Sequence, residues 1–189
     1  HSFPTRRSSD LEIANSITHG IGFFLSIAGL VVMLVYSAAY GTALHIVSSA
    51  VFGSSMIFLY LSSTLYHSIS APKAKHILQV FDHSAIFFLI AGTYTPFTLV
   101  ALKGPWGWTL FGITWGLALL GLLIQFTSLR RFKFLELGLY VGMGWVVVIA
   151  VKPMLNAVSA GGLLLLFLGG VSYTAGIIFY VWKRMPYHH

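Results

Sequence analysis

The sequence predicts an all-α protein that crosses a membrane as a bundle of helices. Hydrophobic residues make up 57% of its 189 residues and charged residues only 8%, with a mean hydropathy of +0.86. A soluble domain carries about 25% charged residues. A chain with so few charged residues cannot form a water-facing surface, so the composition excludes a soluble enzyme. The apolar content also excludes a disordered chain. The absence of cysteine excludes a disulfide scaffold and a thiolate metal site.

The lengths of the apolar segments supply the third observation. A bilayer core of about 30 Å requires about 20 apolar residues in a helix, and six segments qualify. A transmembrane β-barrel instead needs alternating strands of about ten residues, whereas these segments are continuous and longer. The predicted spans are Ile17–Ala39, Ala43–Tyr66, Ile77–Leu102, Trp106–Ser128, Leu135–Val151 and Gly161–Trp182.

Proline, glycine and basic residues separate these spans and predict their orientation. Seven Lys and Arg residues follow the second, fourth and sixth spans, whereas only Lys103 and Lys152 follow the third and fifth. Short cytoplasmic loops carry the excess of basic residues. We therefore expect an integral membrane protein with a cytoplasmic N-terminus. The net charge of +7 reflects these loops and predicts no nucleic-acid partner. Glycines within the spans, Gly121 among them, are interpreted as sites of close helix packing.

Residues 1–11 are interpreted as an artefact rather than native protein. The polar stretch HSFPTRRSSD back-translates without a break as CACTCTTTCCCTACACGACGCTCTTCCGAT. That string is a common short-read sequencing adapter, and its next bases, CT, encode Leu11 whatever base follows. The alternative is a natural basic leader that contains serine. We expect residues 1–11 to contribute nothing to the native fold and residues 12–189 to form one transmembrane domain.

Polar residues at one membrane depth form the candidate site. Asp82 lies about five residues inside the third span, and His67 ends the second span at the same leaflet. Antiparallel neighbours joined by a short loop are expected to touch, so His67 and Asp82 can meet. Ser63 precedes His67 by four residues and shares its helix face, and His189 enters at the same side after the sixth span. Ionisable residues at membrane depth are costly and usually functional.

This set of residue types suits a zinc site. Neutral imidazole binds zinc, and a catalytic zinc ion has three protein ligands and a water. A nearby carboxylate can orient one of the ligands or accept a proton from the bound water. Simpler interpretations stay open: His67 as an interfacial helix cap and Asp82 as an interhelical hydrogen-bond acceptor. We expect His83 to have a packing or supporting role, His76 to be a loop residue and Glu136 to form a loop ion pair. His19 could support the site, but we expect a simple interfacial histidine.

Four segments resemble the bacterial hemolysin III proteins, which are related to the adiponectin and progestin receptors. They are EIANSITHGIG at 12–22, SSTLYH at 62–67, FDHSAIFFLIAGTYTPF at 81–97 and GGVSYTAGIIFY at 169–180. The resemblance covers essentially all of residues 12–189. It implies a protein of the bacterial plasma membrane with seven transmembrane helices, an internal N-terminus and a zinc ion near the cytoplasmic leaflet.

The resemblance also implies roles for particular residues. The family's Ser-x-x-x-His element matches Ser63 and His67, and its aspartate at the start of helix three matches Asp82. The first histidine of the His-x-x-x-His element that opens helix seven matches His189, where this sequence ends. The second histidine and helix seven are absent from the sequence, so we expect a fragment with six of seven spans.

Three functions are compatible with these expectations. The first is a zinc hydrolase acting on lipid amides, since wider relatives resemble ceramidases. In this scheme His67 and His189 hold zinc, Asp82 and Ser63 are catalytic, and membrane lipids supply a substrate that enters laterally. The second is a non-enzymatic receptor or membrane-homeostasis protein with structural zinc. The third is a cytolysin, as the family name says, although the sequence has no long amphipathic pore-forming segment.

Overall fold

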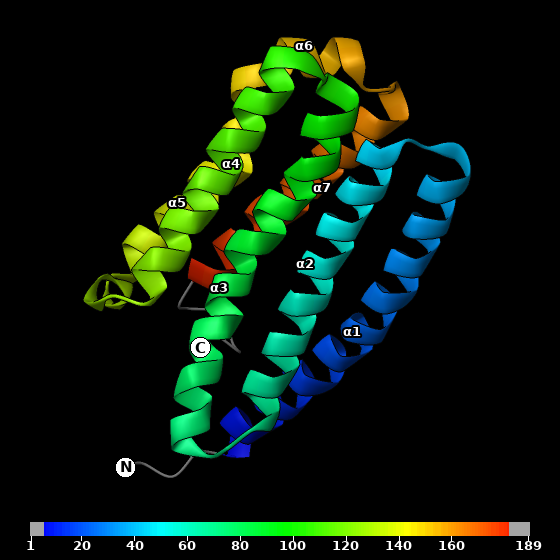
Figure 1. The fold of residues 1–189 in the computed structure, drawn as a ribbon. Helices are drawn as coiled ribbons and strands as arrows, with labels where there is room; N and C mark the ends of the chain where they lie inside the picture. The colour runs from blue at the N-terminus through cyan, green and yellow to red at the C-terminus, as the bar shows by residue number, and fades with distance from the viewer. Residues whose placement is uncertain (1–5, 182–189) are drawn as a thin grey trace.

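The computed structural model describes residues 6–181 of the chain, and Figure 1 shows them as a bundle of long helices. Long apolar runs form helices in a membrane because each backbone N–H and C=O group is then paired within its own segment. In chain order the elements are α1 (Arg6–Tyr40), α2 (Ala43–Ser68), α3 (Pro72–Pro96), η1 (Phe97–Leu102), α4 (Gly104–Gln125), η2 (Ser128–Arg131), α5 (Lys133–Trp145), η3 (Val146–Ala150), α6 (Val151–Ala157) and α7 (Ala160–Val181).

Six helical stretches are long and apolar enough to span a membrane, which confirms the predicted fold class. Three coincide with α1 from Asp10, with α2 and with α4. The third span joins α3 to the π-helical η1 as Pro72–Leu102, and the fifth joins α5, η3 and α6 as Lys133–Ala157. The sixth is α7 as far as Phe179. This part of the chain is therefore an all-α integral membrane bundle.

The fifth span differs from its predicted form. The sequence predicted a break after Val151, marked by Lys152 and Pro153, but both residues lie inside α6. Pro153 is tolerated because it stands in the first turn of α6, where a backbone N–H has no intrahelical acceptor to lose. The helix instead changes at η3, a 3-10 segment.

Tyr94 of α3 accounts for this change in helix type. Its hydroxyl donates a hydrogen bond to the carbonyl oxygen of Gly144 at 2.9 Å and accepts one from the backbone N–H of Val147 at 3.1 Å. A side chain that inserts into the backbone hydrogen-bond ladder distorts an α-helix locally. The contact therefore ties α3 to the middle of the fifth span.

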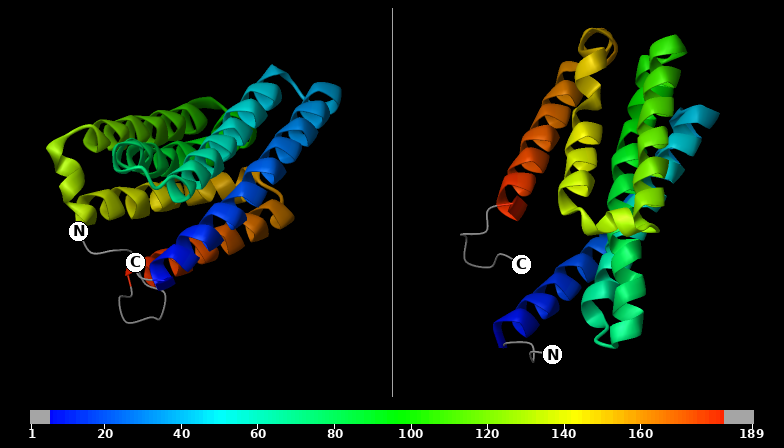
Figure 2. Two further views of the ribbon diagram at one scale, coloured as in Figure 1. Left: turned by 90° about the horizontal axis from the view of Figure 1, so that it is seen from below. Right: turned by 90° about the vertical axis from the view of Figure 1, so that its left-hand side faces the viewer.

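Successive spans run antiparallel, so their connections alternate between the two ends of the bundle. The α2–α3 and α4–α5 connections lie at the end where α1 begins, and the α1–α2, η1–α4 and α6–α7 turns lie at the other (Figure 1). Helices α1, α2, α3 and α4 each pack on the next. Helix α7 packs beside α5, at the edge of the bundle (Figure 2).

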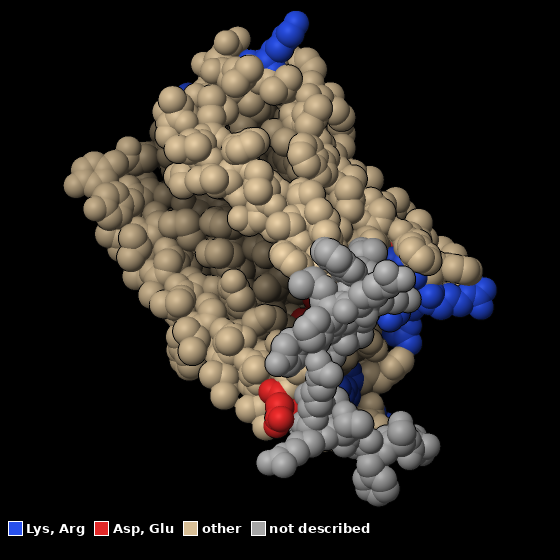
Figure 3. Space-filling view, turned by 180° about the vertical axis from the view of Figure 1, so that it is seen from behind, with Lys and Arg blue, Asp and Glu red and all other residues tan. Residues whose placement is uncertain are grey.

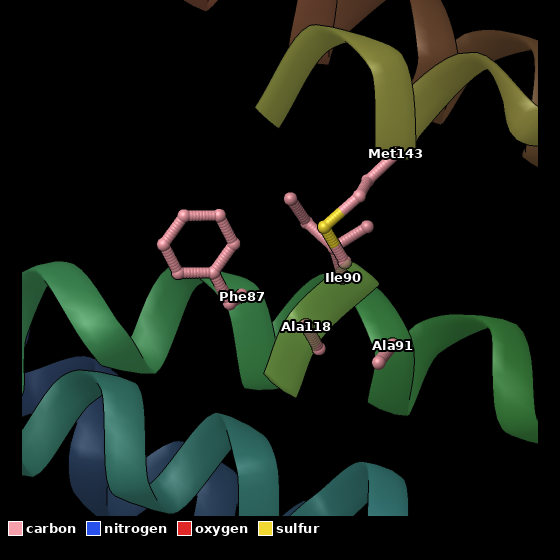
Figure 4. Close-up of a cluster of buried hydrophobic side chains, with 5 residues drawn as sticks. All are labelled: Phe87, Ile90, Ala91, Ala118 and Met143. Carbon is pink, nitrogen blue, oxygen red and sulfur yellow. The ribbon is translucent and has the colours of Figure 1, made fainter. Parts of the chain in front are cut away.

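Helix α3 supplies more of the buried hydrophobic side chains than any other element in the described part of the chain. Figure 4 shows Phe87, Ile90 and Ala91 of α3 against Ala118 of α4 and Met143 of α5. All five side chains are buried, and those of Phe87, Ala91 and Met143 are 0% exposed. Burial at this contact fixes the position of α3, the helix that carries Asp82.

The glycines divide into two groups, so the packing interpretation holds for only some of them. Gly22, Gly121 and Gly144 lie directly against the rings of Tyr60, Phe87 and Tyr173, where a Cβ atom would overlap the ring. Other predicted packing glycines have open space where a Cβ atom would lie, and for them the interpretation was wrong. They are Gly29, Gly112, Gly116, Gly138 and Gly142.

The charged groups leave a broad uncharged band across one face of the bundle. In the view of Figure 3 the Lys, Arg, Asp and Glu side chains gather toward the two ends, and the surface between them carries almost none. The middle of this face is hollowed. Large apolar side chains such as Phe24, Leu165 and Phe167 are exposed along α1 and α7, as expected for helices in contact with lipid.

Candidate functional site

A set of polar contacts joins α1 to α2 near the end of the bundle where α1 begins. The Nδ1 atom of His67 lies 2.8 Å from Oε2 of Glu12, and Nζ of Lys75 lies 3.0 Å from the other carboxylate oxygen. These residues come from the start of α1, the end of α2 and the first turn of α3. Glu12 therefore links three helices at the position predicted for the site.

His19 extends this set of contacts deeper into the bundle. Its Nδ1 atom lies 2.6 Å from the hydroxyl oxygen of Ser63, a side chain that is 3% exposed. The rings of His19 and His67 are 6.0 Å apart between centroids. Ser63 and His67 thus share one face of α2, as their spacing predicted, and α1 supplies a partner for each. Below, "the α1–α2 polar cluster" means Glu12, His19, Ser63 and His67.

Asp82 lies on α3 with a half-buried side chain. Its carboxylate is close enough to His19 to interact with it electrostatically, but it makes no hydrogen bond or ion pair with any residue that the structure describes. The α1–α2 polar cluster and Asp82 therefore belong to one region of the molecule. The structure shows no direct hydrogen bond or ion pair between Asp82 and His67, whose Nδ1 atom faces Glu12 instead, and the catalytic role of Asp82 stays a prediction.

The metal site is only partly covered by the structure, because His189 lies outside the described residues. Within residues 6–181, no three His, Asp or Glu side chains are close enough together to hold a metal ion. The donor chemistry of His67 nevertheless suits a metal. Nδ1 faces the Glu12 carboxylate, and Nε2 has no hydrogen-bond partner in the described part of the chain.

A second polar cluster was misjudged from the sequence. Glu136 was expected to form a loop ion pair, but its side chain is buried within α5. Its Oε1 atom accepts hydrogen bonds from His83 at 2.7 Å, Gln125 at 2.7 Å and Tyr140 at 2.8 Å. The basic residues of the α4–α5 connection are close to Glu136 in sequence, but the amphipathic α5 turns its carboxylate inward. The packing role expected for His83 is confirmed by this contact, whereas a supporting role at the zinc site stays a prediction.

The contacts correct the expectations for His76 and His19. They also reveal Glu12, which the sequence analysis did not identify. His76 lies on α3 rather than in a loop, and its Nε2 atom accepts a hydrogen bond from Arg130 at 2.7 Å. His19 is not a simple interfacial histidine, because it contacts Ser63. Sequence reasoning missed Glu12, although its spacing of seven residues from His19 places both on one face of α1.

Comparison with known proteins places this helical bundle in a family. Residues 8–188 match the family described as "Haemolysin-III related". "Hemolysin-3 homolog" of Bacillus subtilis (strain 168) is 54% identical over 178 residues, which cover 94% of this chain and 84% of that protein. "Hemolysin-3" of Bacillus cereus is 46% identical over 178 residues, covering 94% of this chain and 81% of that protein.

A more distant relative is found in animals. "Monocyte to macrophage differentiation factor" of Homo sapiens is 27% identical over 139 residues, which cover 71% of this chain and 57% of that protein. No solved structure matches the chain. The extent of the family match and the identity to the two Bacillus proteins show that this chain is a member of the haemolysin-III-related family of integral membrane proteins.

Proposed function

We propose that the protein is a membrane-embedded, zinc-dependent hydrolase acting on lipid amides. The observation that carries the proposal is the α1–α2 polar cluster, in which two histidines, a serine and a carboxylate gather at one end of a mostly apolar bundle. Ionisable residues within a membrane protein are rare and mark functional sites by default. Asp82, which interacts electrostatically with His19, adds a second carboxylate to this region.

Each residue has a chemical role in this proposal. His67, through Nε2, and His189 would hold the zinc ion. A bound zinc ion would supply a water whose pKa is lowered to about 7. Asp82 would orient a water at the site or accept a proton there. Ser63 donates a hydrogen bond to the developing oxyanion. This last role requires His19 to donate from Nδ1 to the serine oxygen, because the Ser63 hydroxyl hydrogen is then free.

The proposed substrate is a membrane lipid that reaches the site from the bilayer. The exposed apolar surfaces of α1 and α7 support lateral access, since lipid contacts these helices directly. The hollowed face in Figure 3 gives such a substrate room to approach. We also propose, from the distribution of basic residues, that the N-terminus and the α1–α2 polar cluster lie on the cytoplasmic side.

A non-enzymatic role is the second candidate, and one contact favours it. The 2.6 Å contact between Ser63 and His19 joins α1 to α2, as a purely structural interaction would. In that case zinc would hold helices together and the protein would act as a receptor or in membrane homeostasis. The protein would then catalyse no reaction, so loss of Asp82 would lower no reaction rate. The hydrolase proposal instead makes Asp82 essential for lipid-amide hydrolysis.

Release of labelled fatty acid from a lipid amide, such as a ceramide, distinguishes the two candidates. The assay uses zinc-supplemented protein in lipid nanodiscs. Asp82→Ala should lower the hydrolysis rate about 10²–10⁴-fold, the usual contribution of a general base. His76→Ala is the matched control, because it removes a polar side chain from the same helix.

The result contradicting the hydrolase proposal is equally specific. Asp82→Ala protein that folds, binds zinc and cleaves lipid amides at the unsubstituted rate would exclude the role given to Asp82. Absence of zinc-dependent cleavage across a panel of lipid amides would favour the non-enzymatic candidate.

A further inference from the structure

We propose that Glu12 is a positioning residue that fixes the tautomer of His67 and directs its Nε2 atom to the metal. The inference rests on the proposed zinc site and adds a residue to it. Glu12 stands at the beginning of the first span, 55 residues before His67 in sequence, yet its Oε2 atom lies 2.8 Å from His67 Nδ1.

The charge on Glu12 determines which atom donates. Lys75 lies 3.0 Å from Oε1 of Glu12, and this cation favours the ionised carboxylate. An ionised carboxylate only accepts hydrogen bonds. His67 must therefore carry its proton on Nδ1 and donate it to Oε2. In a neutral imidazole the other ring nitrogen then keeps its lone pair, so Nε2 is the atom able to bind a metal ion.

The contact also fixes the direction of the ring. The His67 side chain is 16% exposed and that of Glu12 is 35% exposed, so the pair is partly shielded from water. Ring contacts with His19 and Tyr66, at 6.0 Å and 4.9 Å between centroids, limit rotation further. A carboxylate that accepts from a metal-binding histidine both orients the ring and raises its basicity.

Helix α1 offers a matched control for this role. Ser16 lies one turn from Glu12, and its hydroxyl is 2.6 Å from that of Ser68 on α2. Ser16→Ala removes a contact between the same two helices without touching His67. A variant that merely loosens α1 from α2 can therefore be separated from one that releases the His67 ring.

The experiment has two readouts on the purified chain in detergent. The first is the ¹⁵N spectrum of the histidine rings without metal, in which the His67 signals are assigned by their loss in His67→Ala. These signals report which ring nitrogen carries the proton. The second is zinc affinity, measured by competition with a chelator of known affinity.

We expect Glu12→Ala to shift His67 away from the Nδ1–H tautomer and to weaken zinc binding about 10–100-fold. Glu12→Gln should recover part of both effects, because its amide oxygen still accepts a hydrogen bond while its charge is lost. Ser16→Ala should change neither readout. Circular dichroism and size-exclusion profiles that match the unsubstituted chain establish that each variant is folded.

Three results would overturn the inference, and they differ in meaning. An unchanged tautomer and affinity in Glu12→Ala, with zinc binding lost in His67→Ala, would remove the role of Glu12 but keep the zinc site. An equal loss in Ser16→Ala and Glu12→Ala would assign the effect to α1–α2 packing. Unchanged zinc affinity in His67→Ala would contradict the proposed zinc site itself.

Discussion

The ring of His83 and the carboxylate of Glu136 lie 2.7 Å apart and join α3 to α5 inside the bundle. Gln125 of α4 donates to the same carboxylate oxygen, so one side chain connects three spans. Buried polar groups need such partners because an unpaired group in an apolar interior carries its full desolvation cost. The network therefore stabilises the half of the bundle that carries Asp82.

Replacing Glu136 should destabilise the protein. Glu136→Leu removes the acceptor for His83, Gln125 and Tyr140. The bonds from His83 and Gln125 are interhelical, and such bonds in membrane proteins average about 0.6 kcal/mol each, so we expect a loss of about 1–2 kcal/mol. Reversible unfolding in mixed detergent measures it. Gln125→Leu is the matched control and should lose only about 0.6 kcal/mol, since it removes one donor. Equal losses in the two variants would show that Glu136 is not the centre of the network.

Two glycines of α4 should respond oppositely to alanine. At Gly121 a Cβ atom would overlap the buried Phe87 ring, so Gly121→Ala should cost about 1–3 kcal/mol through overpacking. At Gly116 nothing lies within 4 Å of the added atom. Gly116→Ala should therefore be neutral or stabilise the helix by up to about 1 kcal/mol. Thermal unfolding of both variants decides the matter, and a destabilising Gly116→Ala would contradict the predicted difference.

Ser63 should matter to catalysis more than its neighbour Ser62. Both side chains are buried, but Ser62 donates to its own helix at the carbonyl oxygen of Phe58, whereas Ser63 contacts His19. Loss of one oxyanion donor costs about 10²–10³ in kcat, which we expect for Ser63→Ala in the lipid-amide assay. Ser62→Ala should leave kcat unchanged. Equal rates in the two variants would show that Ser63 is only a helix-packing residue.

The proposed orientation predicts the location of reporters fused to the chain. A reporter after Arg184 should be cytoplasmic, and one inserted beside Lys103 should be external, because basic loops stay inside. A pair of fusions carrying alkaline phosphatase and a fluorescent protein measures this. The reverse pattern would place the α1–α2 polar cluster at the outer leaflet.

The spans could be predicted from sequence because bilayer thickness fixes their length. The end of the fifth span could not, since Pro153 is harmless in the first turn of α6 and the contact of Tyr94 with this span is tertiary. The helix spacing of Ser63 and His67 predicted their shared face on α2. Glu12 was missed because no local pattern relates a carboxylate to a histidine 55 residues away.

Glu136 shows the same limit in a different way. Basic neighbours in sequence suggested a loop ion pair, but the three atoms that donate to its carboxylate belong to α3, α4 and α5. Glycine packing was predicted by residue type alone, whereas the structure separates Gly121, which meets a ring, from Gly116, which does not. For Glu136 and for the glycines, the sequence could not show which surfaces of two distant segments face each other.

The measurement that tests the central proposal most directly is the zinc affinity of the chain compared with that of His67→Ala. Loss of a supporting residue typically costs 10–100-fold in metal affinity, and loss of a ligand should cost at least as much. We therefore predict at least about a 100-fold weaker affinity for His67→Ala. His76→Ala, which removes a histidine bonded to Arg130, should bind as the unsubstituted chain does. Equal zinc affinity with and without the His67 imidazole would contradict the account.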